Sequence, residues 1–145
     1  MERARETAAP LAREKTLTVD VWPAFTEVDA GNWTGRTFAE LGALEGWRQH
    51  NEFRTGTAIP GGESAIQVQE RFVGGLLRLR ELRPHGTVAI VSHGDPIKFS
   101  LAYFLGVPLD FHDRLQIDFG SISTLTLDGW AARVIRVNEV PRGEP

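Results

Sequence analysis

The chain has 145 residues, of which 41% are hydrophobic and 24% are charged. A globular chain of this length buries roughly 68–70% of its unfolded surface, so the composition predicts one compact domain and excludes a disordered protein. Sixteen Lys and Arg against nineteen Asp and Glu give a formal net charge of −3, and no apolar run approaches the ~20 residues of a membrane helix. We therefore expect no nucleic acid and no membrane among the partners.

The sequence contains no cysteine, which excludes a disulfide framework, a thiol nucleophile and a cysteine-based metal site. The first residues mix charges of both signs and hold no apolar stretch of the kind that a secretory signal needs. Both observations favour a cytoplasmic location.

The predicted elements begin with a helix that lasts to about Arg13, because alanines and a leucine recur there at helical spacing. No capping residue precedes this helix, although a helix start normally has its free N–H groups satisfied. The alternation of apolar and polar residues over Leu17–Val21 then predicts a half-buried strand that ends at Trp22-Pro23.

Two capping boxes mark the next helices. Thr37-Phe-Ala-Glu40 predicts a helix to about Arg48, and Ser64-Ala-Ile-Gln67 predicts a longer one to about Leu82. The loop between them ends in Pro60-Gly61-Gly62. Such glycines let backbone approach a ligand closely, and a plain turn between helices is an equally good interpretation.

A short continuous apolar run, Thr87–Val91, predicts a central strand that is covered on both faces. A helix from about Pro96 to Leu105 follows. The remaining predicted strands are Leu115–Phe119, Ile122–Leu127 and Ala131–Val137, with a turn at Asp128-Gly129. Strands interleaved with helices predict an α/β fold with an antiparallel hairpin near the C-terminus.

His93 follows the predicted central strand, at the edge of the sheet where open α/β folds bind ligands. We expect Asp95 to cap the next helix and Pro96 to take its first position, which brings free N–H groups and the positive end of the helix dipole near His93. A phosphate-sized anion fits such a place. From spacing alone, a plain polar residue at a strand end is an equally good interpretation.

Two further polar residues are candidates. Glu27 lies in the segment Phe25–Gly35, where two glycines and Trp33 indicate a shaped loop, although a solvated carboxylate is the default interpretation. Arg3 is interpreted by itself as an exposed helix charge. Its guanidinium is nevertheless the side chain best shaped for bidentate phosphate binding.

Other chemistries lack support. The sequence has no G-x-S-x-G, P-loop, G-x-G-x-x-G or H-E-x-x-H motif. His50, His85 and His112 lack metal-ligand spacing, so we expect no bound metal and no cofactor, and His112-Asp113 is interpreted as an exposed loop pair. Ser92 and His93 are adjacent on a strand, which points their side chains to opposite faces and disfavours a hydrolase that uses them together.

Four segments in order along almost the whole chain, taken as one domain over residues 1–145, resemble the histidine phosphatase superfamily of phosphoglycerate-mutase-like proteins. Met1-Glu-Arg-Ala-Arg-Glu-Thr-Ala8 is similar to the latter part of S-P-x-x-R-A-x-x-T-A. The segment Phe25–Gly35 resembles L-x-E-x-x-F-G-x-W-E-G, with departures at Ala30 and Thr34. Pro60-Gly-Gly-Glu-Ser64 matches P-G-G-E-S, and Val91-Ser-His-Gly94 matches the segment of the second catalytic histidine.

The resemblance implies a partial three-layer sandwich around a mixed sheet, and a metal-free reaction through phosphohistidine on a small phosphorylated metabolite. In that reaction a first histidine, in an R-H-G motif, attacks phosphorus. Arg3, His93 and Gly94 are then implied to bind the phosphoryl oxygens. Glu27, the second catalytic residue beside His93, is implied to protonate the leaving oxygen and later to accept a proton from water.

The R-H-G motif is absent from this sequence. In the family it lies on a first strand, before a helix and a second strand that lead into S-P-x-x-R. We therefore expect that a strand–helix–strand unit of roughly 30 residues or more is missing. The chain is then the C-terminal part of a phosphomonoester phosphatase, and we expect it to be inactive by itself. Phosphatase is favoured over mutase because the segment Glu27–Glu63 is compact.

The missing strands would lie in the middle of the sheet, between Leu17–Val21 and Thr87–Val91. Without them Val88–Val91 has an unpaired apolar edge, which is a liability for pairing or aggregation, so we expect poor folding or self-association. The alternative is a naturally short pseudo-phosphatase that keeps Arg3 and His93 as an anion site or serves as an interaction module.

Overall fold

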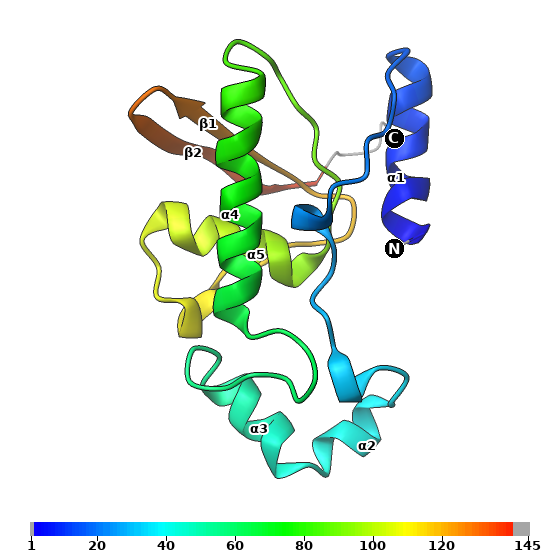
Figure 1. Ribbon diagram of the computed structural model, residues 1–145, viewed down its shortest axis with the longest axis vertical. Coiled ribbons are helices and arrows are strands. Elements are labelled where there is room, and N and C mark those ends of the chain that lie inside the picture. The colour runs from blue at the N-terminus through cyan, green and yellow to red at the C-terminus, as the bar shows by residue number, and fades with distance from the viewer. Residues whose placement is uncertain (1, 141–145) are drawn as a thin grey trace.

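The computed structural model describes residues 2–140 (Figure 1). Its helices and strands are α1 (Glu2–Glu14), α2 (Phe38–Gly42), α3 (Glu45–Glu52), α4 (Ala65–Leu82), α5 (Gly94–Leu105), β1 (Ile122–Asp128) and β2 (Ala131–Glu139), with short 3-10 helices η1 (Pro23–Phe25), η2 (Gly31–Trp33) and η3 (Leu109–Arg114). The predicted α/β class is confirmed, as is the hairpin, whose antiparallel register pairs Asp128 with Ala131. Within residues 2–140, no helix has the length and apolar character needed to cross a membrane.

The core is organised around α4, which runs through the centre of the molecule (Figure 1). One buried cluster joins α4, α5 and η3 through Ala65, Val68, Phe99 and Leu109. A second cluster of Trp33, Leu41 and Ile59 packs η2 and the segment before α4 against α2. Local signals set the ends of these helices: the Ser64 capping box starts α4, and Gly106 ends α5 in the left-handed conformation at φ 67°.

The single helix predicted from Thr37 to about Arg48 is wrong, because the chain forms two helices there. The Thr37 capping box is present and starts α2, but this helix ends at Gly42. Leu44 is extended, with φ −89° and ψ 127°, and α3 begins after it. The bend lets the Trp47 ring pack edge to face against buried Trp33, with centroids 5.2 Å apart.

Three of the predicted strands do not form in the described residues. Leu17–Val21 and Thr87–Val91 belong to no ladder, and the one regular sheet among residues 2–140 is the two-stranded hairpin. Leu115, expected to begin the third strand, instead closes η3 with its N–H bonded to His112 O. Apolar patterning predicts which residues suit a strand, but a strand exists only where a second one pairs with it.

A groove of about 430 Å³ lies where the two unpaired segments run between α4 and α1 (Figure 1). Its lining is mostly apolar and includes Ala8 and Leu11 of α1, Leu79 and Leu82 of α4, Val19, Val21, Val88 and Ile90. Leu17 and Val21 are 61% and 63% exposed, and no described residue of α1 is buried. The apolar run Val88–Val91 also pairs with no strand among residues 2–140, and Val88 is 45% exposed.

His112 is buried, so its interpretation as part of an exposed loop pair is wrong. The ring packs edge to face against Phe99 at 5.0 Å, and its Nδ1 lies 3.1 Å from Leu109 O. Burial lowers the pKa of His112, with the carboxylate of Asp113 acting in the opposite direction. This histidine belongs to the core.

His50 is the second histidine in the core, and its hydrogen bonds fix one neutral form of the ring. Nε2 lies 3.0 Å from Nη1 of Arg54, which can only donate, so Nδ1 carries the proton and donates it to Thr57 Oγ1 at 3.1 Å. Burial, and next the charge of Arg54, lower the pKa of His50 to about 4.

We predict that the protein loses stability on acidification between pH 6.5 and about 4. Below pH 6.5 the unfolded chain takes up the His50 proton, whereas the folded chain does not until about pH 4, so acid favours unfolding. This difference corresponds to at most roughly 3 kcal/mol. Urea unfolding at a series of pH values measures the free energy of unfolding. We expect His50→Gln to make this free energy depend less on pH. His85→Gln, at an exposed position, is the control. An unchanged slope in His50→Gln contradicts the prediction.

Candidate active site

Three of the candidate residues predicted from the sequence meet at one point, although they come from distant segments. Arg3 lies in the first turn of α1, Glu27 follows η1, and His93 is the residue before α5. The Arg3 guanidinium donates from Nη2 to Glu27 Oε2 at 2.7 Å and from Nε to His93 Nδ1 at 3.2 Å. Glu27 Oε2 itself lies 3.2 Å from His93 Nδ1. A cation, a carboxylate and an imidazole thus share one site.

The His93 ring is almost fully enclosed, with its side chain 4% exposed, while the side chain of Arg3 is 73% exposed. When Nδ1 accepts the Arg3 hydrogen bond, the ring proton resides on Nε2. That nitrogen is buried and has no hydrogen-bond partner among the described residues. Leaving such a group unpaired is costly, so Nε2 is suited to donate to an oxygen of a bound anion.

Burial is the main reason why the pKa of His93 is lowered. The carboxylate of Glu27 acts in the opposite direction, because it stabilises the imidazolium, and the Arg3 guanidinium adds to the lowering. The ring is therefore neutral at pH 7. A neutral ring with its proton on Nε2 is a hydrogen-bond donor that adds no further charge to the site.

The start of α5 differs from the expectation in one detail. His93 itself is the N-cap residue and Gly94 is the first helical residue, so Asp95 and Pro96 each lie two positions further into the helix than predicted, and the assignment of Asp95 as the cap is wrong. Asp95 instead lies 3.7 Å from the Arg54 guanidinium. The first intrahelical bond runs from Ile97 N to His93 O, which leaves the Gly94 amide free of an intrahelical acceptor beside His93.

The glycines at Pro60-Gly61-Gly62 do bring backbone into close approach, but against another loop of the same protein. A Cβ on Gly31 would lie 2.4 Å from Gly62 N, and Gly31 itself has φ 44°. Asn32 N donates to Pro60 O at 2.8 Å. The Pro60–Gly62 turn therefore supports the loop that carries Glu27.

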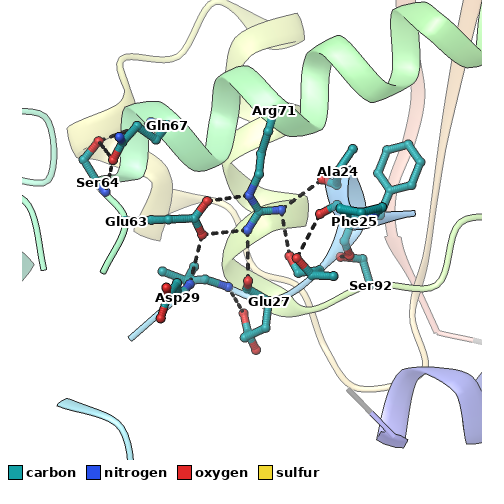
Figure 2. Close-up of polar contacts among 12 residues, drawn as sticks. Ala24, Phe25, Glu27, Asp29, Glu63, Ser64, Gln67, Arg71 and Ser92 are labelled. Atoms are coloured by element: carbon teal, nitrogen blue, oxygen red, sulfur yellow. Dashed lines mark hydrogen bonds and ion pairs between the residues drawn. The ribbon is translucent and has the colours of Figure 1, made fainter. Parts of the chain in front are cut away.

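Sequence reasoning missed Arg71 of α4, whose guanidinium contacts the Glu27 loop and Glu63 (Figure 2). The available signal was the Glu63 carboxylate just before the Ser64 cap, followed on the helix by an arginine. Hydrogen bonds from Arg71 and Asp29 lower the pKa of Glu63, so this carboxylate is ionised at neutral pH.

Ser92 links His93, the next residue, to the segment that carries Glu27. Its hydroxyl donates to Phe25 O at 2.8 Å, which attaches the residue before His93 to the segment that leads to Glu27 (Figure 2). The Ser92 proton is thereby engaged with a backbone carbonyl, which speaks against a hydrolase with Ser92 as nucleophile. Among residues 2–140 there is no cluster of three or more His, Asp or Glu suited to hold a metal ion.

Comparisons with known proteins show what the chain is similar to. The model of the histidine phosphatase superfamily, branch 1, matches residues 1–140 of the chain. Bifunctional protein Rv2228c of Mycobacterium tuberculosis is 36% identical over 125 residues, which are 85% of this chain and 34% of that protein. Phosphoserine phosphatase 1 of Hydrogenobacter thermophilus is 28% identical over 140 residues, which are 95% of this chain and 66% of that protein.

A similar solved structure is the complex of mycobacterial glucosyl-3-phosphoglycerate phosphatase Rv2419c with inorganic phosphate. It superimposes with a TM-score of 0.78 at 27% identity, over 94% of this chain and 72% of that one. The resemblance noted from the sequence is confirmed. The chain spans about a third of the length of the first relative and about two thirds of the second.

The shared Nδ1 contact predicts opposite effects of its two partners on His93. Glu27→Gln removes the carboxylate that stabilises the imidazolium, so it lowers the pKa of His93 further. Arg3→Ala removes an opposing cation, so it raises that pKa. Histidine ring resonances followed by NMR through a pH titration measure both, with His50 as the internal control. Shifts in the same direction, or none, contradict the described contact.

Proposed function

We propose, since the chain belongs to the histidine phosphatase superfamily, that it carries the phosphate-binding and proton-transfer residues of a phosphomonoester phosphatase. The observation that supports this most is the convergence of Arg3, Glu27 and His93 within 2.7–3.2 Å of one another. Two relatives whose names describe phosphatases share much of the chain. Small phosphorylated metabolites are the substrate class that we propose for the complete enzyme.

In the proposed reaction, a histidine nitrogen outside this sequence attacks phosphorus, the bond from phosphorus to the substrate oxygen breaks, and Glu27 gives that oxygen its proton. Water then attacks the phosphohistidine, Glu27 takes the proton back, and inorganic phosphate leaves. Arg3, His93 Nε2 and the Gly94 amide stabilise the charge on the phosphoryl oxygens throughout. Each assigned residue has a chemical group suited to its role.

The nucleophile is the one part that this sequence does not supply. Its histidines are His50, His85, His93 and His112, and none lies in an R-H-G motif. We therefore propose that the chain has negligible turnover by itself. The alternative is a non-catalytic pseudo-phosphatase that binds an anion or a partner. It is favoured because the sequence lacks the R-H-G histidine but keeps Arg3 and His93.

The DNA immediately upstream of the Met1 codon separates these two proposals. Translation in frame that reads Ser-Pro just before Met1, and R-H-G further upstream, supports a larger phosphatase in which Arg3, Glu27 and His93 act as described. A stop codon or unrelated sequence at that place contradicts it and leaves the pseudo-phosphatase.

We predict that the chain binds inorganic phosphate saturably and that it does not hydrolyse p-nitrophenyl phosphate. Arg3→Ala and His93→Ala each remove a hydrogen-bond donor, and a bond to a charged group is worth about 1.5–3 kcal/mol, so binding weakens about 10- to 100-fold. Calorimetric or NMR titration measures this, with Arg13→Ala at the far end of α1 as control. Absence of binding contradicts the phosphate site, and hydrolysis that His93→Ala abolishes contradicts the proposed inactivity.

We also propose that the groove between α1 and α4 accommodates a second copy of this chain. Its lining is mostly apolar and includes Leu17–Val21 and Val88–Val91, which belong to no ladder among residues 2–140. Such unpaired edges are templates for strand pairing. Both segments are available in every copy, so each copy can act as donor and acceptor.

Association is therefore expected to rise with concentration and to fall in Val88→Lys, which places a charge on the apolar edge. Sedimentation velocity at several concentrations measures it. Ile135→Lys is the matched control, because Ile135 is also an exposed apolar residue but lies on the edge of the hairpin. A wild-type chain that stays monodisperse and monomeric contradicts the proposal, and dissociation by Ile135→Lys alone assigns the contact to the hairpin instead.

A further inference from the structure

The backbone that carries Glu27 has no regular secondary structure after η1, and each carbonyl from Ala24, in η1, to Glu27 accepts a hydrogen bond from a side chain. Arg71 donates from Nη1 to Ala24 O at 2.9 Å and to Thr26 O at 3.0 Å, and from Nη2 to Glu27 O at 2.9 Å. The fourth carbonyl, of Phe25, accepts from Ser92. Four consecutive carbonyls, two from the end of η1 and two from the segment after it, thus accept hydrogen bonds from side chains of other parts of the chain (Figure 2).

The same guanidinium is oriented by a carboxylate. Arg71 donates from Nε to Glu63 Oε1 at 2.7 Å and from Nη2 to Glu63 Oε2 at 2.9 Å, in a parallel two-bond arrangement. All five N–H donors of the arginine are therefore used. Glu63 also accepts from Asp29 N at 2.9 Å, and its own N–H donates to Asp29 O at 3.0 Å, which fixes the chain beyond Glu27 as well.

This arrangement determines where the Glu27 carboxylate lies. With the backbone fixed on both sides, Glu27 Oε1 accepts from Val28 N at 3.1 Å, and Oε2 is left to face Arg3 and His93. Packing acts in the same direction, since the Phe25 ring meets Phe72 of α4 edge to face at 4.9 Å. α4 thus supports the loop through both polar and apolar contacts.

We propose that Arg71, oriented by Glu63, is the positioning residue that holds the Glu27 carboxylate against His93. Among residues 2–140, the hydrogen bonds of Arg71 go to Glu63 and to backbone carbonyls and not to Arg3 or His93, so it acts through Glu27. The proposal rests on the proposed role of Glu27. Lysine cannot replace it, because three donors on a single nitrogen cannot reach two carboxylate oxygens and three carbonyls together.

The pKa of His93, measured by NMR in the chain as it exists, reports the position of the Glu27 carboxylate. Arg71→Lys is expected to lower this pKa in the same direction as Glu27→Gln, because the carboxylate moves away from the imidazole. In the double variant, Arg71→Lys is expected to add nothing to Glu27→Gln. A merely structural role would lower stability and leave the His93 titration unchanged.

Arg78→Lys is the matched control, since Arg78 lies on the same helix and makes an exposed ion pair with Glu81. Glu63→Gln keeps the side-chain length but removes the charge that orients Arg71, so it tests the Arg71–Glu63 pair in case Arg71→Lys fails to fold. In the unaltered chain, the Arg71 Nε–H is expected to exchange slowly with water, and rapid exchange would overturn the proposal without any substitution.

The outcomes separate this proposal from the function on which it rests. If Glu27→Gln itself leaves the His93 titration unchanged, the contact between the two proposed catalytic groups is wrong. If Glu27→Gln shifts the pKa of His93 but Arg71→Lys and Glu63→Gln do not, the contact between Glu27 and His93 is supported and the positioning role of Arg71 is overturned. Equal shifts in Arg78→Lys would also overturn it.

Discussion

The guanidinium of Arg71 is the interaction on which the candidate site depends. A loop that presents a catalytic group has to satisfy its backbone carbonyls without a helix or a sheet, and unpaired carbonyls in a partly buried segment are costly. Arg71 satisfies three of them and Ser92 the fourth. The loop is therefore fixed by side chains from α4 and from the residue before His93, and not by a ladder.

These side-chain hydrogen bonds explain how the site forms beside the groove, although the segments that line the groove belong to no sheet. Glu27 and His93 are held through α4 and Ser92, and α4 is itself packed into the core cluster with α5 and η3. Arg3 differs, because it lies on α1, of which no described residue is buried. An exposed ion pair contributes little by itself, so Arg3 is the site residue whose position has the least support.

Burial gives three histidines a common property with different consequences. The pKa values of His50, His93 and His112 are all lowered, chiefly by desolvation. His50 and His112 have core neighbours and serve packing. His93 differs from His112 in what its Nδ1 meets: a guanidinium and a carboxylate from two distant segments lie within 3.2 Å of it, whereas His112 Nδ1 faces the carbonyl of Leu109. This convergence distinguishes a candidate catalytic group from a core histidine.

The sequence by itself determined the features whose signals act within a few residues. The Ser64 capping box, the Gly106 terminus and the Asp128-Gly129 turn specify where α4, α5 and the hairpin begin or end, and the order of four motifs indicated Arg3, Glu27 and His93. Tertiary structure alone decided what depends on distant partners. Leu17–Val21 and Thr87–Val91 have the composition of strands but pair with no strand within residues 2–140, and Arg71 reaches carbonyls 44 to 47 positions away in the sequence. A hydrogen bond across such a separation leaves no local pattern, because its geometry exists only after the chain has folded.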